Sequence, residues 1–216
     1  SGGEMSYTLY ARPGAGSAAV EALLAVLGLP HEVVDVVKNS DGSSPDWYLR
    51  LNPRGEVPTL KLPDGSIMTE SAAMMLYLSD SHAEAGLAPA LSAPDRAQYL
   101  RWMVYLAAAP YATDLRLYYP ERYSTDPAHA PAIRVKAAAD LERDFAVLAD
   151  GMGAGPFLLG SKLSALDIYA AMLLSWSDDV PGLFARHPKL KRLYEKVAET
   201  PALKPAWARN KMPDVT

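Results

Sequence analysis

The sequence contains no cysteine in its 216 residues. Disulfide bonds are therefore excluded, which fits the reducing cytoplasm, where few proteins depend on them. The same absence excludes every mechanism that uses a thiol of the protein itself, including Cys-x-x-Cys redox chemistry.

Signals for secretion, membranes, nucleic acids and metals are also missing. No apolar run reaches the ~18 residues of a membrane span, and the first residues lack the basic segment and apolar core of a secretory signal. The formal net charge of −4 gives no basic surface for nucleic acid. The histidines show no ligand spacing, so we predict no metal site. We expect a cytoplasmic protein with no membrane partner, and we interpret residues 1–4 as a remnant added ahead of Met5.

The N-terminal part combines strand and helix patterns. Apolar residues alternate in the strand segments and recur three and four positions apart in the helical ones. We expect strands at 7–11, 31–37, 57–62 and 66–68 and helices at 17–27, 46–51 and 70–80. The order β-α-β-α-β-β-α predicts an α/β domain over 6–83, with the first two strands parallel and joined by a right-handed crossover.

Strand patterns disappear after Pro94. We expect helices at 93–117, 131–148, 164–177, 188–200 and 201–209. Pro110 should kink the first of them. Ser164 and Asp167 have the spacing of a capping box at the start of the most apolar helix. The second part is therefore predicted to be an all-α domain over 93–216.

A glycine motif between the first strand and the first helix suggests nucleotide binding. Gly14, Gly16 and Ala19 fit the G-x-G-x-x-G/A fingerprint, and Asp35 follows at the distance expected for a ribose contact. A dinucleotide domain continues with further β-α-β units, however, and a hairpin follows here. The glycines are better explained by a loop that needs unusual backbone angles.

Several short motifs together resemble the glutathione transferase family over nearly the whole chain from Tyr7. They are Asn52-Pro53-Arg54-Gly55, Val57-Pro58, Glu70-Ser71 before an apolar helix, and PFLLGSKLSALDIYAA from Pro156. The resemblance implies a thioredoxin-like α/β domain followed by an all-α helical domain, usually in a cytoplasmic homodimer that acts in detoxification. Glutathione would be the substrate or cosubstrate, with no metal.

The resemblance also implies a glutathione site. Pro58 would follow a cis peptide bond that exposes the backbone of Val57 to the cysteinyl part of glutathione. Glu70 and Ser71 would hold the γ-glutamyl end, because the first turn of a helix attracts anions. Arg12 and Lys38 are further candidates for contacts with carboxylates of the ligand.

Three groups are candidates for ionising the glutathione thiol, whose pKa in solution is about 8.5. The position of the catalytic cysteine or serine of relatives falls at Gly14 to Gly16, which have no side-chain donor. The neighbouring Ser17 hydroxyl is the first candidate and Tyr10 the second. The backbone amides of residues 15–18 are the third.

The electrophilic second substrate is expected to be apolar or aromatic. The resemblance places its pocket near an aromatic cluster that includes Trp102, Tyr105 and Tyr111. Conjugation of glutathione to this acceptor is the leading function. An isomerase or ether-cleaving relative and a non-catalytic glutathione-binding protein remain alternatives, and the acceptor's identity stays open.

Overall fold

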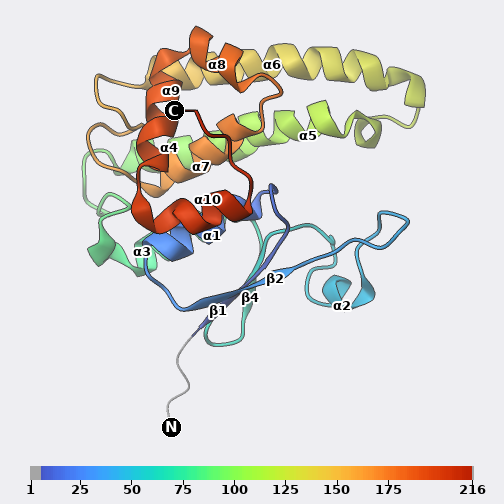
Figure 1. Ribbon diagram of the computed structural model, residues 1–216, viewed down its shortest axis with the longest axis horizontal. Helices are drawn as coiled ribbons and strands as arrows, with labels where there is room; N and C mark the ends of the chain where they lie inside the picture. Colours follow the sequence, from blue (N-terminus) through green and yellow to red (C-terminus); the bar gives the residue numbers. More distant parts are fainter. Residues whose placement is uncertain (1–5, 216) are drawn as a thin grey trace. The chain divides into compact units, whose positions relative to one another are not determined.

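The computed structural model describes residues 6–215, so the interpretation of residues 1–4 lies outside the described part. The chain, drawn in Figure 1, divides into two compact units. Unit 1 contains Ser1–Ala88 and Val197–Thr216, and unit 2 contains Pro89–Lys196. The last residues of the chain therefore belong to the unit that contains the sheet. The predicted folding domains, 6–83 and 93–216, stay a prediction.

Unit 1 contains a four-stranded sheet in the order β2-β1-β3-β4. Its strands are β1 (Tyr7–Ala11), β2 (His31–Asp35), β3 (Thr59–Lys61) and β4 (Ile67–Met68). β1 and β2 are parallel, and the other two pairs are antiparallel. The helices are α1 (Ser17–Val26), α2 (Asp46–Leu49), α3 (Ser71–Ser81) and α10 (Lys204–Arg209), with 3₁₀ turns at Ala83–Ala85 and Pro201–Leu203. The predicted mixed sheet and its element order are confirmed.

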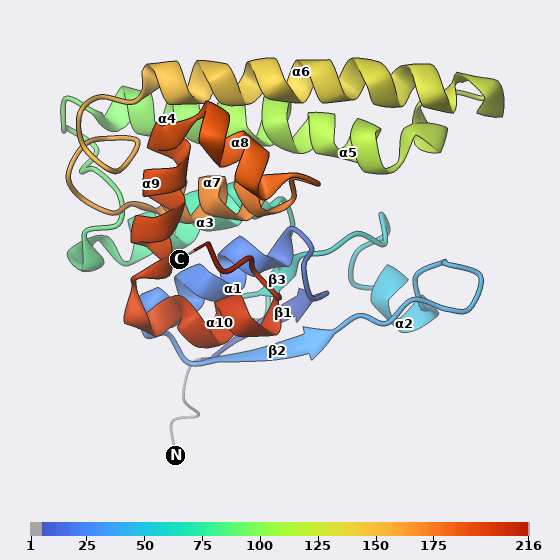
Figure 2. The same cartoon turned by 45° about the horizontal axis from the view of Figure 1, so that its top comes forward.

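One face of the sheet is covered by helices, as Figure 2 shows for α1, α3 and α10. Leu9 and Ala11 point to this buried face, whereas Tyr10 between them is only partly buried, as expected for alternation along a strand. α1 ends where predicted, since Gly28 adopts the left-handed conformation (φ +64°) that stops a helix.

Unit 2 is helical, as predicted. Its helices are α4 (Arg96–Leu106), α5 (Ala112–Tyr118), α6 (Ala130–Gly151), α7 (Ala165–Ser175) and α8 (Val180–Arg186), and α9 (Pro188–Ala198) extends past its boundary. Short 3₁₀ turns lie at Pro120–Tyr123 and Pro127–His129. The helices α5 and α6 pack side by side (Figure 2). No helix among the described residues is long and apolar enough to cross a membrane.

Two details of unit 2 differ from the sequence-based expectation. The single helix expected at 93–117 is interrupted by a π-helical turn, Ala107–Tyr111, which contains Pro110. Proline has no N–H and its ring crowds the preceding turn, so the local winding widens. α8 was not predicted, because Pro181 and Gly182 in its first turn are residues typical of a loop.

Candidate functional site

The candidate site lies at one edge of the sheet in unit 1. Thr59 at the start of β3 pairs with Tyr10 near the end of β1, so the segment before β3 and the loop after β1 share this edge. Met68 at the end of β4 pairs with Leu60, which brings the start of α3 there too. Because β2 is parallel to β1, the loop with Lys38 also leaves from this edge. The binding residues named from the sequence at this edge are Arg12, Lys38, Val57, Pro58, Glu70 and Ser71.

The Val57–Pro58 peptide bond is cis, as the resemblance implied. The carbonyl of Glu56, just before it, accepts hydrogen bonds from the Tyr48 hydroxyl (2.5 Å) and from Asn52 Nδ2 (2.9 Å). Burial raises the pKa of Tyr48, so its phenol stays protonated and able to donate. Neither the N–H nor the C=O of Val57 forms a hydrogen bond within residues 6–215. The segment is therefore anchored through the Glu56 carbonyl, and the N–H and C=O of Val57 remain available to a ligand.

The start of α3 provides further backbone donors. Glu70 precedes the helix in a left-handed conformation (φ +70°), which is strained for a residue with a side chain. No side chain caps this end of α3. In the described chain the amides of Ala72 and Ala73 have no acceptor. Uncapped N–H groups at a helix start favour an anionic ligand.

The loop from Arg12 to Ser17 is organised by hydrogen bonds of its own. The Ser17 hydroxyl accepts from the Arg12 N–H and donates to the Arg12 carbonyl, both at 3.1 Å. Ser17 is 0% exposed. A hydroxyl has one hydrogen, and that of Ser17 is already donated to the backbone.

Two amides at the start of α1 remain open. Ala15 N–H donates to the Arg12 carbonyl and Ala18 N–H to the Ala15 carbonyl. The N–H groups of Gly16 and Ser17 have no acceptor anywhere in the described residues, and both residues are buried. Buried amides without partners are rare and call for an explanation, such as a ligand.

Tyr10 lies against a different part of unit 1. Its ring packs against Trp47 and Tyr48, with centroids 6.1 Å from each. It alternates with Leu9 and Ala11, so it lies on the sheet face opposite to them. The assignment of thiol ionisation to Ser17 or Tyr10 stays a prediction.

Arg12 is tied to the sheet at only one of its nitrogens. Its Nε donates to the Val36 carbonyl at 3.3 Å, whereas Nη2 is buried and meets no acceptor among residues 6–215. A buried guanidinium nitrogen in this state is suited to an anion. Lys38 is exposed in the following loop.

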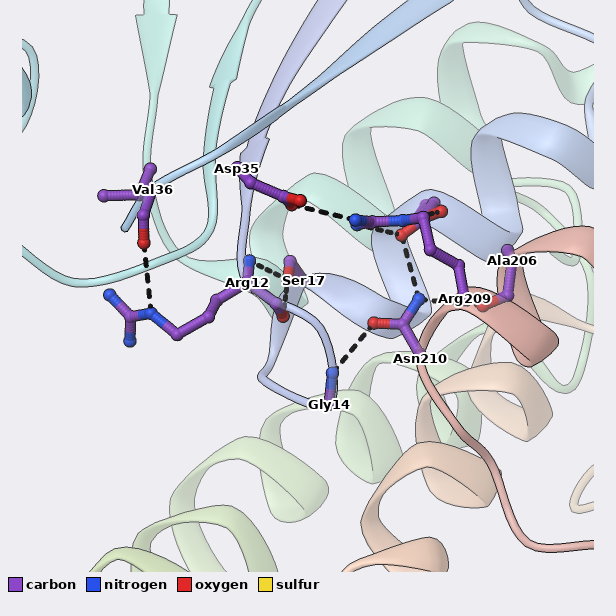
Figure 3. A network of polar contacts seen from close by, with 9 residues as sticks. Arg12, Gly14, Ser17, Asp35, Val36, Ala206, Arg209 and Asn210 are labelled. Atoms are coloured by element: carbon purple, nitrogen blue, oxygen red, sulfur yellow. Dashed lines mark hydrogen bonds and ion pairs between the residues drawn. The ribbon is translucent and has the colours of Figure 1, made fainter. Parts of the chain in front are cut away.

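Sequence reasoning missed the C-terminal residues that contact this loop (Figure 3). Asn210 Oδ1 accepts from the Gly14 N–H at 3.0 Å, and Arg209 pairs with Glu21 of α1. Hydrogen bonds to Glu21 and Asp35 hold the pKa of Arg209 above its ordinary value. No local signal marks these residues, since 196 positions separate Gly14 from Asn210.

In unit 2 the three predicted acceptor residues contact different helices. Trp102 is buried, and a side chain at Gly151 of α6 would collide with its ring. Tyr105 donates to the Asp144 carbonyl of the same helix at 2.9 Å. Tyr111 instead packs against Trp176, with ring centroids 5.1 Å apart and nearly perpendicular planes. Trp102 and Tyr105 therefore face α6, and Tyr111 faces the end of α7.

A buried carboxyl in unit 2 was also missed from the sequence. Asp114 is 2% exposed, and neither of its oxygens has a partner in the part of the chain described. Burial, and then the nearby carboxylates of Asp178 and Asp144, raises the pKa of Asp114 to about 8. Tyr118 lies in the same region, and its single hydroxyl hydrogen is shared between the Trp176 carbonyl and Asp178 Oδ1.

Comparisons with known proteins agree with this architecture. Family models match the glutathione S-transferase N-terminal domain at residues 17–81 and the C-terminal domain at 127–196. Glutathione S-transferase GST-4.5 of Xanthomonas campestris is 30% identical over 189 residues, covering 86% of this chain and 91% of that protein. This chain belongs to the glutathione S-transferase family.

Other glutathione S-transferase relatives cover nearly the whole chain. The uncharacterized GST-like protein YncG of Escherichia coli is 29% identical over 206 residues, which are 94% of this chain and 98% of YncG. A solved glutathione transferase homolog from Sulfitobacter, with bound glutathione, matches with a TM-score of 0.86 and 25% identity, covering 97% of this chain and 100% of that one. The family, the fold and glutathione as the family's ligand are thus supported over both units.

Proposed function

We propose that the protein is a glutathione transferase that ionises the thiol of bound glutathione and conjugates it to an apolar or aromatic electrophile. The observation that carries the proposal is a set of backbone groups at one sheet edge that are unpaired within the described residues: the Val57 peptide, the Gly16 and Ser17 amides, and the Ala72 and Ala73 amides in the first turn of α3. A tripeptide with a backbone, a thiolate and two carboxylates is complementary to these groups. The glutathione-bound Sulfitobacter homolog supports this assignment.

Each end of glutathione has a candidate partner. Val57 would pair with the cysteinyl backbone, Ser71 would take the γ-glutamyl carboxylate, and Glu70 would hold the ammonium group. The unpaired Nη2 of Arg12 is available to a carboxylate, and Lys38, in the loop after β2, would compete for the glycyl end. Most of the affinity would come from preorganised backbone donors, which lose little entropy on binding.

The thiolate would be stabilised by the open amides of Gly16 and Ser17, at the positive end of the α1 dipole. The Ser17 hydroxyl is occupied by Arg12, so in this proposal it holds the loop. In the reaction the thiol proton leaves to solvent and the thiolate attacks the electrophilic carbon. With a chloroarene, a C–S bond forms, the C–Cl bond breaks, and chloride departs with the bonding electrons.

The acceptor would be bound by aromatic side chains of unit 2. Tyr111 and Trp176 are both partly exposed and in contact, which suits a flat apolar ligand. Trp102 and Tyr105 would pack α4 against α6 rather than contact the acceptor. We further propose that the protein is a homodimer in the cytoplasm. Light scattering after gel filtration tests the oligomeric state.

The binding test is titration calorimetry of the wild-type protein with glutathione. Ser71→Ala should weaken glutathione binding about tenfold, since one hydrogen bond to a carboxylate is lost. Ser81→Ala, at the exposed end of the same helix, is the matched control and should bind like wild type. No binding by the wild-type protein would contradict the proposal.

The turnover test uses chlorodinitrobenzene and separates an enzyme from a binding protein. The second candidate, a non-catalytic glutathione-binding protein, is favoured by the absence of a free side-chain donor beside Gly16. Binding with conjugation above the uncatalysed rate supports the transferase. Binding without turnover of a panel of electrophiles would support the second candidate instead.

A further inference from the structure

Asn210 uses its whole side-chain amide in contacts within unit 1. Its Oδ1 accepts from the Gly14 N–H at 3.0 Å, and its Nδ2 donates to Glu21 Oε2 at 2.9 Å and to the Ala206 carbonyl at 2.8 Å (Figure 3). The partners fix the amide orientation, because an N–H needs the oxygen and a carboxylate needs the nitrogen. Asn210 is 4% exposed, so water does not compete for these bonds.

Arg209 completes the connection between the C-terminus and α1. Its Nε and Nη2 donate to the two oxygens of Glu21 at 2.7 and 2.8 Å, and its Nη1 donates to Asp35 Oδ1 at 2.8 Å. Glu21 is 5% exposed, and this paired geometry is the most directional that an ion pair adopts. One carboxylate of α1 thereby fixes both Arg209 and Asn210.

These polar contacts are not needed to bury α10. Leu203, Ala206 and Trp207 are already buried around it, and the contacts of α10 and its preceding turn are mainly with α1. Replacing a buried ion pair by apolar groups is often neutral for stability. What the pair does supply is a defined direction for the Asn210 oxygen.

The group that receives this oxygen is in the loop that carries the open amides. Ser17 and Val36 hold the loop at Arg12. Among the described residues, Gly14 is the residue of this loop that is hydrogen-bonded to the C-terminal segment. Gly14 has φ +75°, a conformation that leaves its N–H pointing at Asn210 and that only glycine adopts without strain. Two residues later come the Gly16 and Ser17 amides.

We propose that Asn210, fixed by Arg209 and Glu21, is a positioning residue for thiol ionisation: it holds Gly14 so that the Gly16 and Ser17 amides converge on the sulfur of glutathione. The inference rests on the proposed function and adds to it a role for the last residues of the chain. Hydrogen-bond donors stabilise a forming anion most effectively when they are held in place beforehand, because no free energy is then spent on reorienting them.

The experiment measures the thiol pKa of bound glutathione by its ultraviolet absorbance, with kcat/KM for chlorodinitrobenzene conjugation. Asn210→Ala should raise the thiol pKa by about one unit and lower kcat/KM about tenfold at neutral pH. Arg209→Lys, which keeps the charge but loses the paired geometry, should give a smaller shift in the same direction. Binding of S-methylglutathione, which has no thiol to ionise, should change less than twofold.

Lys204→Ala is the matched control, because Lys204 is exposed on α10 and makes none of these contacts. Amide hydrogen exchange at Gly14 verifies that Asn210→Ala releases the loop. A released Gly14 with a wild-type thiol pKa and kcat/KM would overturn the inference. So would an equal loss of S-methylglutathione binding, which would indicate general loosening of the site.

Two further results complete the test. If Asn210→Ala does not fold, Arg209→Lys decides, and an unchanged thiol pKa in that variant overturns the inference. If the wild-type protein binds no glutathione, the proposed function fails and the inference falls with it. If the wild-type protein binds glutathione and lowers the pKa of the glutathione thiol, and the variants lower that pKa equally, the inference alone fails and the proposed function stands.

Discussion

The helices α1 and α7 are both deeply buried but begin in opposite ways. At α7 the Ser164 side chain accepts from the Asp167 amide, and Asp167 accepts from the Ser164 and Leu158 amides. At α1 no side chain caps the first turn, and the amides of Gly16 and Ser17 have no acceptor in residues 6–215. The amides at the start of α7 are satisfied within the protein, whereas those of Gly16 and Ser17 at the start of α1 lack an acceptor in the described residues.

We infer from this difference that the capped start of α7 contributes to stability, whereas the uncapped start of α1 is available to a ligand. Leaving a buried donor unpaired costs roughly 1–3 kcal/mol, so a fold keeps such donors only where another molecule satisfies them. At α1 the nearest hydroxyl, that of Ser17, is directed to Arg12. The following predictions test the contrast, starting with the largest effect.

Removing the cap of α7 should reduce stability strongly. Asp167→Ala leaves the Leu158 and Ser164 amides unpaired in the core, so we expect a loss of about 3 kcal/mol in the free energy of unfolding. Urea denaturation measures it. Ser164→Ala, which removes only one partner, should cost about 1 kcal/mol. Equal losses in the two variants would contradict the assignment of Asp167 as the central acceptor.

Removing a donor at α1 should affect activity instead. Gly16 has φ −60°, an angle that proline adopts, so Gly16→Pro deletes one open amide with little backbone change. We expect kcat/KM for conjugation to fall about 100-fold, as for loss of one donor to a developing anion. Gly16→Ala keeps the amide and is the matched control. Wild-type activity in Gly16→Pro would remove the amide from the mechanism.

A third comparison concerns two buried carboxyls, Asp167 with three donors and Asp114 with none. Burial raises the pKa of both carboxyls, that of Asp114 to about 8 and that of Asp167 to about 6. The native state therefore binds protons that the unfolded state releases above the ordinary pKa of 3.8. Stability should therefore decrease as pH rises between about 4 and 8, by up to ~1.4 kcal/mol per pH unit for each carboxyl.

Asp114→Asn should remove the part of that decrease between about pH 6 and 8. Below that range Asp167 contributes as well, because burial raises the pKa of its carboxyl to about 6. Urea denaturation at several pH values in this window measures the slope for the variant and for wild type. Asp150→Asn, at an exposed position of α6, should leave the slope unchanged. A slope that persists between about pH 6 and 8 in Asp114→Asn would assign the pH dependence in that range to another group.

The smallest effects are expected at the two side chains first considered for thiol ionisation. Ser17→Ala should lower kcat/KM only a few-fold, because it loosens the loop without removing a donor to sulfur. Tyr10→Phe should change kcat/KM less than twofold, since its ring contacts remain. A large loss in either variant, with normal glutathione binding, would restore that residue as the activating group.

The sequence was sufficient for the fold because the relevant signals are local. Alternating and helical apolar patterns predict most elements of unit 1, and Ser164 with Asp167 predicts the start of α7. Boundaries shifted by a few residues, as with β2, which ends at Asp35 instead of Val37. Strand ends depend on pairing with a neighbour, which the pattern does not contain.

The site was predicted in part for the same reason. Motifs named Val57, Pro58, Glu70 and Ser71 as candidates, and the strand register brings the segments that carry them to one edge. Their role in binding stays a prediction. The direction of the Ser17 hydroxyl and the partners of Asn210 depend on tertiary packing, as does the isolation of Asp114. Residue type alone does not reveal whether a donor is already used.

The most direct measurement is a crystal structure of the protein with glutathione. The account predicts the sulfur within about 3.5 Å of the Gly16 or Ser17 amide nitrogen, with the Ser17 hydroxyl still bonded to Arg12. A sulfur that instead receives its hydrogen bond from the Ser17 or Tyr10 hydroxyl, or that lies away from the start of α1, would contradict it.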